Sequence, residues 1–421
     1  MPLPDHLARL VEAGLRRRRQ GPRGRYAPSP TGPLHRGNLS TALLSWLVSR
    51  LVGGEWLLRI DDLDTPRNRP GASEAIQADL LWLGLDWDGP PLLQSQRRGL
   101  YGSTLSWLRR TGALYPCRCS RRLLADISAP HGAFAVYPGT CAAREPAWGP
   151  QGGRLPSWRL RMPPGRLRWP EQLAPAADLD GPSQVGDVVL RRADGLVAYH
   201  LATAVDELAL GITDVVRGHD LWPATAAQVA VQAALGAGPP TYWHGPLQLD
   251  GNGQRLAKRQ GAGGLADLRQ QGLDAAAVVG LLAADLELVG QGSRLSAAEL
   301  RQELGMQGFI LKQSSCFQNP SSPLSNRPPS GCPRSESGSG SSSGSSSKSK
   351  PGSGTGAGEP PLQHSNRLEP ADPKPLAEGS IALATPGDRA SRQVFKFQGR
   401  LQQKVAAQWA STHHTADGSP A

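Results

Sequence analysis

The chain has 421 residues, of which 38% are hydrophobic, and it carries a formal net charge of +11 at pH 7. Its length predicts two or three domains, and no apolar run approaches the ~20 residues that a membrane-spanning helix needs. These properties exclude a membrane-spanning protein. They predict a cytoplasmic protein whose excess positive charge favours polyanionic partners such as nucleic acids.

A basic block, Arg16–Arg19, lies near the N-terminus. No hydrophobic stretch follows it, so it is not a secretory signal. Its charge allows two interpretations: the segment contacts phosphate groups, or it is a solvated tail. We therefore expect residues 1–23 to be a basic extension of the folded part.

The most informative segment covers residues 25–38 and reads RYAPSPTGPLHRGN. Its prolines and glycines predict a short extended run followed by a turn. The apolar spacing from Leu39 to Leu51 then predicts an amphipathic helix. Asn38 and Ser40 are both suited to cap this helix.

Phosphate chemistry is expected where this helix begins. Unpaired backbone N–H groups and the positive end of the helix dipole favour an anion there. His35 supplies a proton donor beside that anion, and Gly37 lets a nucleotide approach the backbone closely. The segment resembles the HIGH signature of class I aminoacyl-tRNA synthetases, in the glutamyl-type form that follows a Pro-Ser-Pro-Thr-Gly run.

Beyond this helix, strand and helix patterns alternate, which predicts an α/β fold. Residues 55–60 read as a strand, and Asp61 follows its carboxyl end, where open α/β sheets bind ligands. Another strand is expected at residues 188–190, with Asp194-Gly195 as a hairpin turn. Gly, Pro and Arg are dense from Pro146 to Pro170, which predicts an irregular insertion. The expected helices run from Ser73 to the turn at Asp88-Gly89 and cover residues 101–108, 221–235 and 264–304.

Three of the five cysteines fall within 25 residues, in the pattern C-x-C-x17-Y-x3-C formed by Cys117, Cys119, Tyr137 and Cys141. Without a signal peptide, a reducing compartment and a metal are favoured over disulfides. Thiolates at this spacing can place three sulfurs on one tetrahedral Zn²⁺. On chemistry alone the fourth ligand is His131, because a tyrosine hydroxyl must lose a proton with an unperturbed pKa near ~10. Buried free cysteines without a metal are the other interpretation.

Between Met1 and Leu311 the chain has 33 arginines but a single lysine, Lys258. A lysine retained in so arginine-rich a chain indicates a site where a compact point charge is needed. The surrounding residues 254–260, QRLAKRQ, resemble a degenerate KMSKS loop, the second signature of class I synthetases. In that class the loop folds over ATP, and its lysine stabilises the charge on the leaving pyrophosphate. A solvated surface loop is the alternative.

Residues 24–300 resemble one family, the glutamyl-queuosine tRNA(Asp) synthetases, whose zinc knuckle contains the same Tyr-Pro-Gly-x-Cys stretch. The resemblance implies a class I Rossmann-type catalytic domain with one structural zinc ion. It also implies Tyr137 as the fourth zinc ligand, with His131 kept as the alternative. These enzymes activate glutamate with ATP and Mg²⁺, then transfer it to queuosine in the anticodon of tRNA(Asp). We expect this chain to act as a monomer.

The resemblance also implies which residues form the site. The catalytic residues are His35, Gly37 and Lys258, and the ATP-binding set adds Asn38. The residues that hold glutamate are Arg25, Tyr26, Ala27, Pro28, Ser29, Asp61, Tyr199 and Arg217. Arg25 suits a bidentate contact with a carboxylate. The family usually has a longer glutamate at the position of Asp61, where it is thought to contact the substrate amino group. Surface charge for Arg217 and core packing for Tyr199 are the alternative interpretations.

Beyond about Gly308 the sequence is rich in Ser, Gly and Pro, so we expect it to remain disordered. Roughly fifty residues of helical pattern follow Lys258, too few for an anticodon-binding domain of ~100 residues. A shortened glutamyl-tRNA synthetase that charges a tRNA 3′ end, and a catalytically silent paralogue that only binds tRNA, are the alternatives. The expected division is 1–23 for the extension, 24–115 and 186–262 for the catalytic halves, 116–185 for the zinc-bearing insertion, 263–308 for a short helical region and 309–421 for the tail.

Overall fold

The computed structural model describes residues 1–120, 136–173, 176–247 and 264–306. Its centre is a parallel sheet in which β1 pairs with β2, β2 with β3, and β9 with β10. β1 also lies beside β9, where the N–H of Thr213 donates to the carbonyl of Arg23 over 2.9 Å. The strands are Arg23–Tyr26 (β1), Glu55–Ile60 (β2), Leu92–Leu93 (β3), Asp214–Gly218 (β9) and Thr241–Gly245 (β10).

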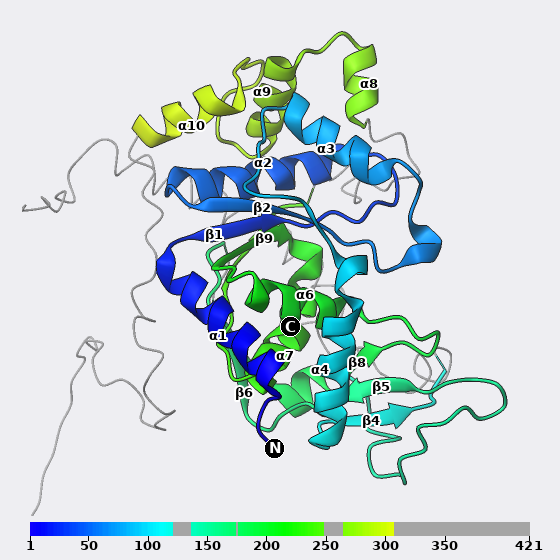
Figure 1. Ribbon diagram of the computed structural model, residues 1–421. Helices are drawn as coiled ribbons and strands as arrows, with labels where there is room; N and C mark the ends of the chain where they lie inside the picture. Colours follow the sequence, from blue (N-terminus) through cyan, green and yellow to red (C-terminus); the bar gives the residue numbers. More distant parts are fainter. Residues whose placement is uncertain (121–135, 174–175, 248–263, 307–421) are drawn as a thin grey trace, which may run out of the picture. The chain divides into compact units, whose positions relative to one another are not determined.

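Helices cover both faces of this sheet (Figure 1). Side chains alternate along β2, so Leu58 and Ile60 join the apolar cluster beneath α2, whereas Leu57 packs against the cluster around α6. Strands that are buried on two faces are typical of α/β proteins, and the predicted fold class is confirmed. One face carries α2 (Arg36–Leu51), α3 (Ala72–Trp82), α9 (Ala275–Asp285) and α10 (Ala297–Met306), and the other carries α1 (Asp5–Gln20), α4 (Arg98–Arg110), α6 (Tyr199–Ala209) and α7 (Trp222–Ala234).

A second group of strands follows α4 in the chain. The strands β4 (Leu114–Cys117), β5 (Ser157–Leu160) and β8 (Val188–Arg191) form an antiparallel sheet, and β6 (Arg166–Trp169) pairs with β7 (Ala177–Asp180). The predicted irregular insertion at residues 146–170 is therefore wrong for β5 and β6. Leu167 and Trp169 are buried while the alternating Arg166 and Arg168 are exposed, so the strand period is present but hidden among Gly, Pro and Arg.

The predicted helices are confirmed, with shifted ends. The helix expected to run from Ser73 to the turn at Asp88 begins at Ala72 and stops at Trp82, because Gly84 adopts a left-handed conformation at φ 75°. The helical stretch expected from 264 to 304 divides into three helices, α8 (Leu265–Gln270), α9 and α10. No helix in the described parts of the chain is long and apolar enough to cross a bilayer.

The predicted hairpin turn at Asp194-Gly195 is also present. Gly195 has φ 92°, which a residue with a side chain rarely adopts, and the N–H of Arg192 donates to the carbonyl of Leu196. The predicted tail from residue 309 onward lies outside the described residues.

The N-terminal extension forms α1, which packs against α6. Leu7 and Val11 are buried, and Gly14 lies so close to α6 that an added Cβ would be 1.9 Å from a backbone oxygen. Arg17 of the basic block donates to the carbonyl of Ala209 over 2.9 Å. The basic block is therefore part of a docked helix and not a tail, although Arg16, Arg17 and Arg19 are exposed to solvent.

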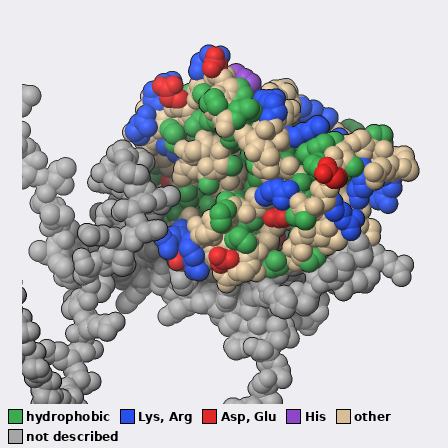
Figure 2. Space-filling view, turned by 90° about the horizontal axis from the view of Figure 1, so that it is seen from below, with side chains coloured by type: hydrophobic (Ala, Val, Ile, Leu, Met, Phe, Trp, Pro, Cys, Tyr) green, Lys and Arg blue, Asp and Glu red, His purple; other side chains and the backbone are tan. Residues whose placement is uncertain are grey.

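Basic side chains form several clusters on the face shown in Figure 2. All of these side chains are arginines, since the described residues include no lysine. This distribution agrees with the net charge of +11 and favours contact with a polyanion.

Candidate active site and metal centre

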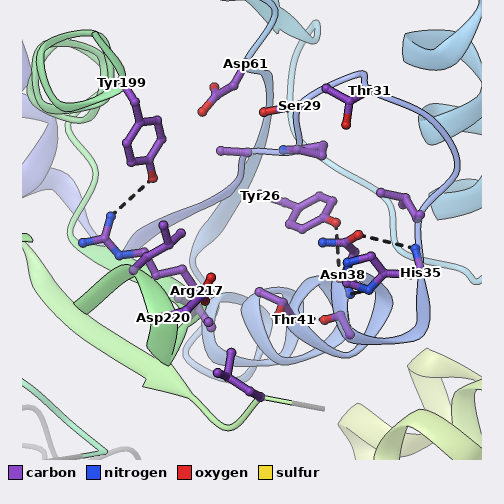
Figure 3. A pocket seen from close by; sticks show the side chains of 18 of the residues that line it. Tyr26, Ser29, Thr31, His35, Asn38, Thr41, Asp61, Tyr199, Arg217 and Asp220 are labelled. Carbon is purple, nitrogen blue, oxygen red and sulfur yellow. Dashed lines mark hydrogen bonds between the residues drawn. The ribbon is translucent and has the colours of Figure 1, made fainter. Parts of the chain in front are cut away.

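A cavity of about 440 Å³ opens where β1, β2 and β9 end and α2 begins. The carboxyl ends of parallel strands share one edge, which is where open α/β sheets bind ligands. In Figure 3, Asp61, Tyr199 and Arg217 lie on one side of the cavity, and His35 and Asn38 on the other. The predicted catalytic and substrate-binding residues that line it are Arg25, Tyr26, Ala27, Pro28, Ser29, His35, Gly37, Asn38, Asp61, Tyr199 and Arg217.

His35 immediately precedes α2 and acts as its N-cap. The backbone N–H of Asn38 donates to His35 Nδ1 over 3.3 Å, and Asn38 Oδ1 accepts from the His35 backbone N–H over 3.4 Å. This reciprocal capping box replaces the predicted cap at Asn38 or Ser40, because the histidine side chain itself reaches the free N–H. Since Nδ1 accepts a hydrogen bond, the neutral imidazole carries its proton on Nε2.

The α2 side of the cavity suits a phosphate group. The N–H groups of Arg36 and Gly37 precede the first backbone bonds of the helix, which run from Asn38 and Leu39 to the carbonyl of His35, and they lie at the positive end of its dipole. Gly37 has no side chain to obstruct an approaching ligand. The hydroxyl of Tyr26 donates to the carbonyl of Asn38 over 3.2 Å, which fixes the start of α2 over β1.

Arg217 lies on the other side of the cavity, near the end of β9, and is only 4% exposed. Its Nε–H donates to His244 Nε2 over 3.1 Å. Its two terminal nitrogens donate to Gln228 Oε1 over 2.8 Å, to Thr225 Oγ1 over 2.6 Å and, at 3.5 Å, toward the hydroxyl of Tyr199. None of these acceptors is a carboxylate. The positive charge of Arg217 is therefore available to an anionic ligand.

Arg25 is buried in a different electrostatic setting. Its Nε and one terminal nitrogen donate to Glu207 Oε1 over 3.0 and 2.9 Å, and the other donates to the carbonyl of Val216 over 3.0 Å. One oxygen of Glu207 thus accepts from both nitrogens that the sequence assigned to a substrate carboxylate. A direct role of Arg25 in glutamate binding stays a prediction.

Asp61 follows β2 and is 8% exposed. Arg59 holds both of its oxygens, donating from Nε to Oδ1 over 2.7 Å and from a terminal nitrogen to Oδ2 over 3.1 Å. Burial raises the pKa of Asp61, and the opposing charge of Arg59 limits that rise. The carboxylate is held firmly at the cavity wall, and its contact with a substrate amino group stays a prediction.

Several residues that line the cavity escaped prediction from the sequence. Thr31 belongs to the same Pro-Ser-Pro-Thr-Gly run, and Thr41 lies one helical turn after Gly37, so the motif itself held a signal for both. Asp220 and Leu247 each lie two residues beyond a strand, β9 and β10, at the edge where ligands bind. Lys258 and the rest of the KMSKS-like loop lie outside the described residues.

The three cysteines of the predicted metal site lie together, with sulfur atoms within 4.8 Å of one another. The sulfurs of Cys119 and Cys141 are 3.7 Å apart, and the hydroxyl of Tyr137 is 3.5 Å from Cys117 Sγ and 3.6 Å from Cys119 Sγ. Zinc bonds of about 2.3 Å to sulfur and about 2.0 Å to oxygen give tetrahedral S–S and S–O edges of about 3.8 and 3.5 Å. The four side chains therefore fit one tetrahedral zinc ion. His131 lies outside the described residues.

The side chains of this cluster differ in how readily they lose a proton. Burial raises the pKa of Cys141, but a hydrogen bond from the backbone of Arg118 and contacts with Tyr137 and the other thiols bring it down to about 7. Burial and the neighbouring thiols raise the pKa of Tyr137. The tyrosine hydroxyl therefore keeps its proton unless a strong positive charge lies beside it.

The chain is similar to one protein family over most of its described length. The family model that matches is described as the catalytic domain of class I tRNA synthetases for E and Q, and it covers residues 23–283. The glutamyl-Q tRNA(Asp) synthetase of Parasynechococcus marenigrum (strain WH8102) is 60% identical over 310 residues, which make up 73% of this chain and 98% of that protein. The protein of the same name from Nitratidesulfovibrio vulgaris is 46% identical over 275 residues, or 62% of this chain and 85% of that protein.

A solved structure shares the fold. It is a glutamate tRNA ligase from Elizabethkingia meningosepticum in complex with its amino acid, with a TM-score of 0.56 and 26% sequence identity. The match covers 67% of this chain and 64% of the ligase chain, so this chain spans just under two thirds of the ligase's length.

Proposed function

The chain belongs to the glutamyl-Q tRNA(Asp) synthetase family within the class I tRNA synthetases for glutamate and glutamine, and from that premise we propose that it activates glutamate with ATP and transfers it to queuosine in the anticodon of tRNA(Asp). As a member of this family it is a ligase of the aminoacyl-tRNA synthetase type. The observation that carries the proposal is the two-sided cavity. Arg217 offers its charge on one side, and the N-terminus of α2 with His35 lies on the other.

Activation needs no general base, because the α-carboxylate of glutamate is already a nucleophile. One carboxylate oxygen attacks the α-phosphorus of ATP, and the bond to pyrophosphate breaks with its electron pair leaving on pyrophosphate. The free N–H groups of α2 and the Nε2–H of His35 stabilise the charge that develops. ATP brings Mg²⁺, which neutralises phosphate charge. Lys258 is proposed to do the same for the leaving group.

The other side of the cavity is proposed to hold the amino acid. Arg217 and the hydroxyl of Tyr199 bind the side-chain carboxylate of glutamate. Asp61 binds its ammonium group, and Arg59 keeps that carboxylate ionised and in place. Two opposite charges at fixed positions would orient the α-carboxylate toward the nucleotide.

Transfer to the anticodon is supported by the extent of the match. The match of 310 residues covers 98% of the Parasynechococcus protein that is named glutamyl-Q tRNA(Asp) synthetase. The glutamate tRNA ligase is covered only to 64%. Its structural similarity nevertheless favours a second candidate, a shortened ligase that charges a tRNA 3′ end. We propose that the chain acts as a monomer in either case.

The deciding experiment uses radiolabelled glutamate, ATP and queuosine-containing tRNA(Asp), followed by nuclease digestion to single nucleosides. We expect the label on the anticodon nucleoside. The matched control is the same tRNA with guanosine in place of queuosine, which should remain unlabelled. Label on the terminal adenosine would favour the second candidate. A chain with no glutamate-dependent ATP–pyrophosphate exchange would be a binding protein instead.

We also propose that Cys117, Cys119, Tyr137 and Cys141 hold one structural zinc ion. The support is the match between their spacing and a zinc tetrahedron. Such a site would tie the end of β4 to the segment that contains Tyr137 and Cys141, and so stabilise the insertion between the two catalytic halves.

Elemental analysis tests the zinc proposal. Wild-type protein should contain about one zinc ion per chain, and Cys119→Ala should lose most of it because three ligands hold zinc far more weakly than four. Cys316→Ala, at a cysteine outside the described residues, is the matched control and should keep full occupancy. Equal zinc contents in the two variants would refute the proposed ligand set.

A further inference from the structure

A buried chain of hydrogen bonds lies behind Arg217, away from the cavity. His244 on β10 is fully buried, and its Nε2 faces the Nε of Arg217. On the opposite side of the ring, Nδ1 lies 2.5 Å from Glu171 Oε2. Glu171 also accepts from the backbone N–H of His244 over 3.1 Å, through its other oxygen. Glu171 follows β6 and is bridged to Tyr242 of β10, so the second group of strands meets the parallel sheet here.

The donors in this series of hydrogen bonds fix the position of each proton. The Nε of Arg217 can only donate, so Nε2 of His244 has to accept, and the single proton of the neutral ring lies on Nδ1. The Nδ1–H group of His244 donates a hydrogen bond to the carboxylate of Glu171. Arg217 on one side of the ring and the ionised Glu171 on the other therefore favour the same tautomer of His244.

The surroundings keep the ring neutral. Burial lowers the pKa of His244 well below its usual value, and Arg217, His219 and Arg25 add to the effect while Asp220 opposes it. A neutral acceptor holds Arg217 without cancelling its charge. Arg25, by contrast, is held by a carboxylate directly.

We propose, building on the proposed function, that Glu171 and His244 are positioning residues that aim Arg217 at the side-chain carboxylate of glutamate by fixing the tautomer of His244. If residue 171 donated a hydrogen bond to Nδ1, the ring proton would move to Nε2 and point at the Nε–H of Arg217. Arg217 would then lose this acceptor and turn away from its present position.

A dependence on pH follows. Burial raises the pKa of Glu171 to about 7. Hydrogen bonds from the backbone N–H groups of His244 and Leu173, and the charges of Arg217 and His219, lower the pKa and so limit this rise. As pH falls through about 7, Glu171 takes up a proton, the tautomer reverses and glutamate binds more weakly. As pH rises above that value, the present arrangement is restored.

Glu171→Gln tests the mechanism without changing the size of the side chain. Its amide oxygen has to accept from the His244 backbone N–H, so its NH₂ group faces Nδ1 and reverses the tautomer. In ATP–pyrophosphate exchange we expect KM for glutamate to rise roughly tenfold, with KM for ATP and kcat within about twofold of wild type. The loss of glutamate affinity below neutral pH should also disappear.

A matched pair of variants at position 244 separates the hydrogen bond to Glu171 from the contacts that Nε2 makes with Arg217 and with the hydroxyl of Thr225. The amide of His244→Asn reaches Glu171 but not Arg217, whereas that of His244→Gln reaches Arg217 but not Glu171. We expect the asparagine variant to match Glu171→Gln and the glutamine variant to stay within roughly threefold of wild type. Thermal unfolding of each variant checks that it folds.

Nitrogen-15 NMR of the histidine rings gives a readout that does not depend on activity. Wild-type His244 should show the Nδ1–H tautomer at pH 8, and Glu171→Gln should show Nε2–H. An Nε2–H tautomer in wild type, or unchanged glutamate KM and pH profile in Glu171→Gln and His244→Asn, would overturn the inference and leave the proposed function intact. A wild-type protein that binds no glutamate in calorimetry would overturn both.

Discussion

Two arginines reach the same cavity with different consequences for charge. Arg25 and Glu207 form a buried ion pair whose side chains are 3% and 0% exposed, so the pair is neutral before any ligand arrives. Arg217 is bonded directly to a histidine, an amide and hydroxyls, which satisfy its N–H groups, and the Glu171 carboxylate acts on its charge only from behind His244. A buried charge whose direct contacts are neutral groups is costly, and a bound carboxylate lowers that cost. Arg217 is therefore the stronger candidate for the carboxylate partner.

Tyr199 offers the most direct test at the scale of single residues. It is 37% exposed, begins α6 and has its hydroxyl beside Arg217. Tyr199→Phe should raise KM for glutamate about three- to tenfold, because one hydrogen bond to the ligand is lost, and should shift Tm by no more than ~2 °C. Tyr242→Phe is the matched control, since that hydroxyl is buried and has no hydrogen-bond partner among the described residues. Equal effects of the two substitutions would rule out a specific role for the Tyr199 hydroxyl.

At the scale of elements, the site depends on how two helices are held against the sheet. The start of α2 is tied to β1 by Tyr26, and its middle by Ser45, whose hydroxyl donates to the carbonyl of Arg25 over 3.0 Å. The helix α6 carries both Tyr199 and Glu207. The docked N-terminal helix α1 packs against α6 near Leu208, so a segment outside the signature motifs supports a helix that carries site residues.

The contact between α1 and α6 is tight at Gly14. A Cβ there would meet the carbonyl oxygen of Leu208 at 1.9 Å, so Gly14→Ala forces the helices apart and should lower the free energy of unfolding by about 2–4 kcal/mol. Gly102 in α4 is the matched control, because nothing lies within 4 Å of its added Cβ. Gly102→Ala should be stabilising by about 0.5–1 kcal/mol through helix propensity. Urea denaturation measures both, and a neutral Gly14→Ala would mean that α1 is not firmly docked.

At the scale of the whole molecule, the matched region and the full chain differ in length. The Parasynechococcus relative is covered to 98% by 310 residues of a chain of 421. The parallel sheet, the cavity and the cysteine cluster all lie before Met306. Everything proposed for catalysis is therefore contained in the first three quarters of the chain.

A truncated chain tests this division. A variant that ends at residue 310 should keep glutamate-dependent ATP–pyrophosphate exchange within about twofold of the full chain, because no proposed site residue is removed. The full chain assayed in parallel is the control. A loss of tenfold or more would assign the tail a part in catalysis.

The sequence alone determined the α/β class, eleven of the residues that line the cavity, and the cysteine cluster. Each of these depends on local information. Apolar periodicity indicates which faces are buried, and the fourteen-residue motif predicts a strand, a turn and the start of a helix. Thiols at short spacing indicate a set of metal ligands. For that reason the predicted lining residues and the four predicted zinc ligands lie together as expected.

Only the tertiary structure decided which bonds these groups make. Arg25 is bonded to a glutamate 182 positions away, and Glu171 to a histidine 73 positions away. The docking of α1 and the strand β5 were likewise missed, because they depend on contacts with distant segments, whereas β6 was missed because Gly, Pro and Arg hide its strand period. A side chain's chemistry states what it can bond to, but hydrogen bonds act only over about 3 Å, and the fold alone brings distant partners that close.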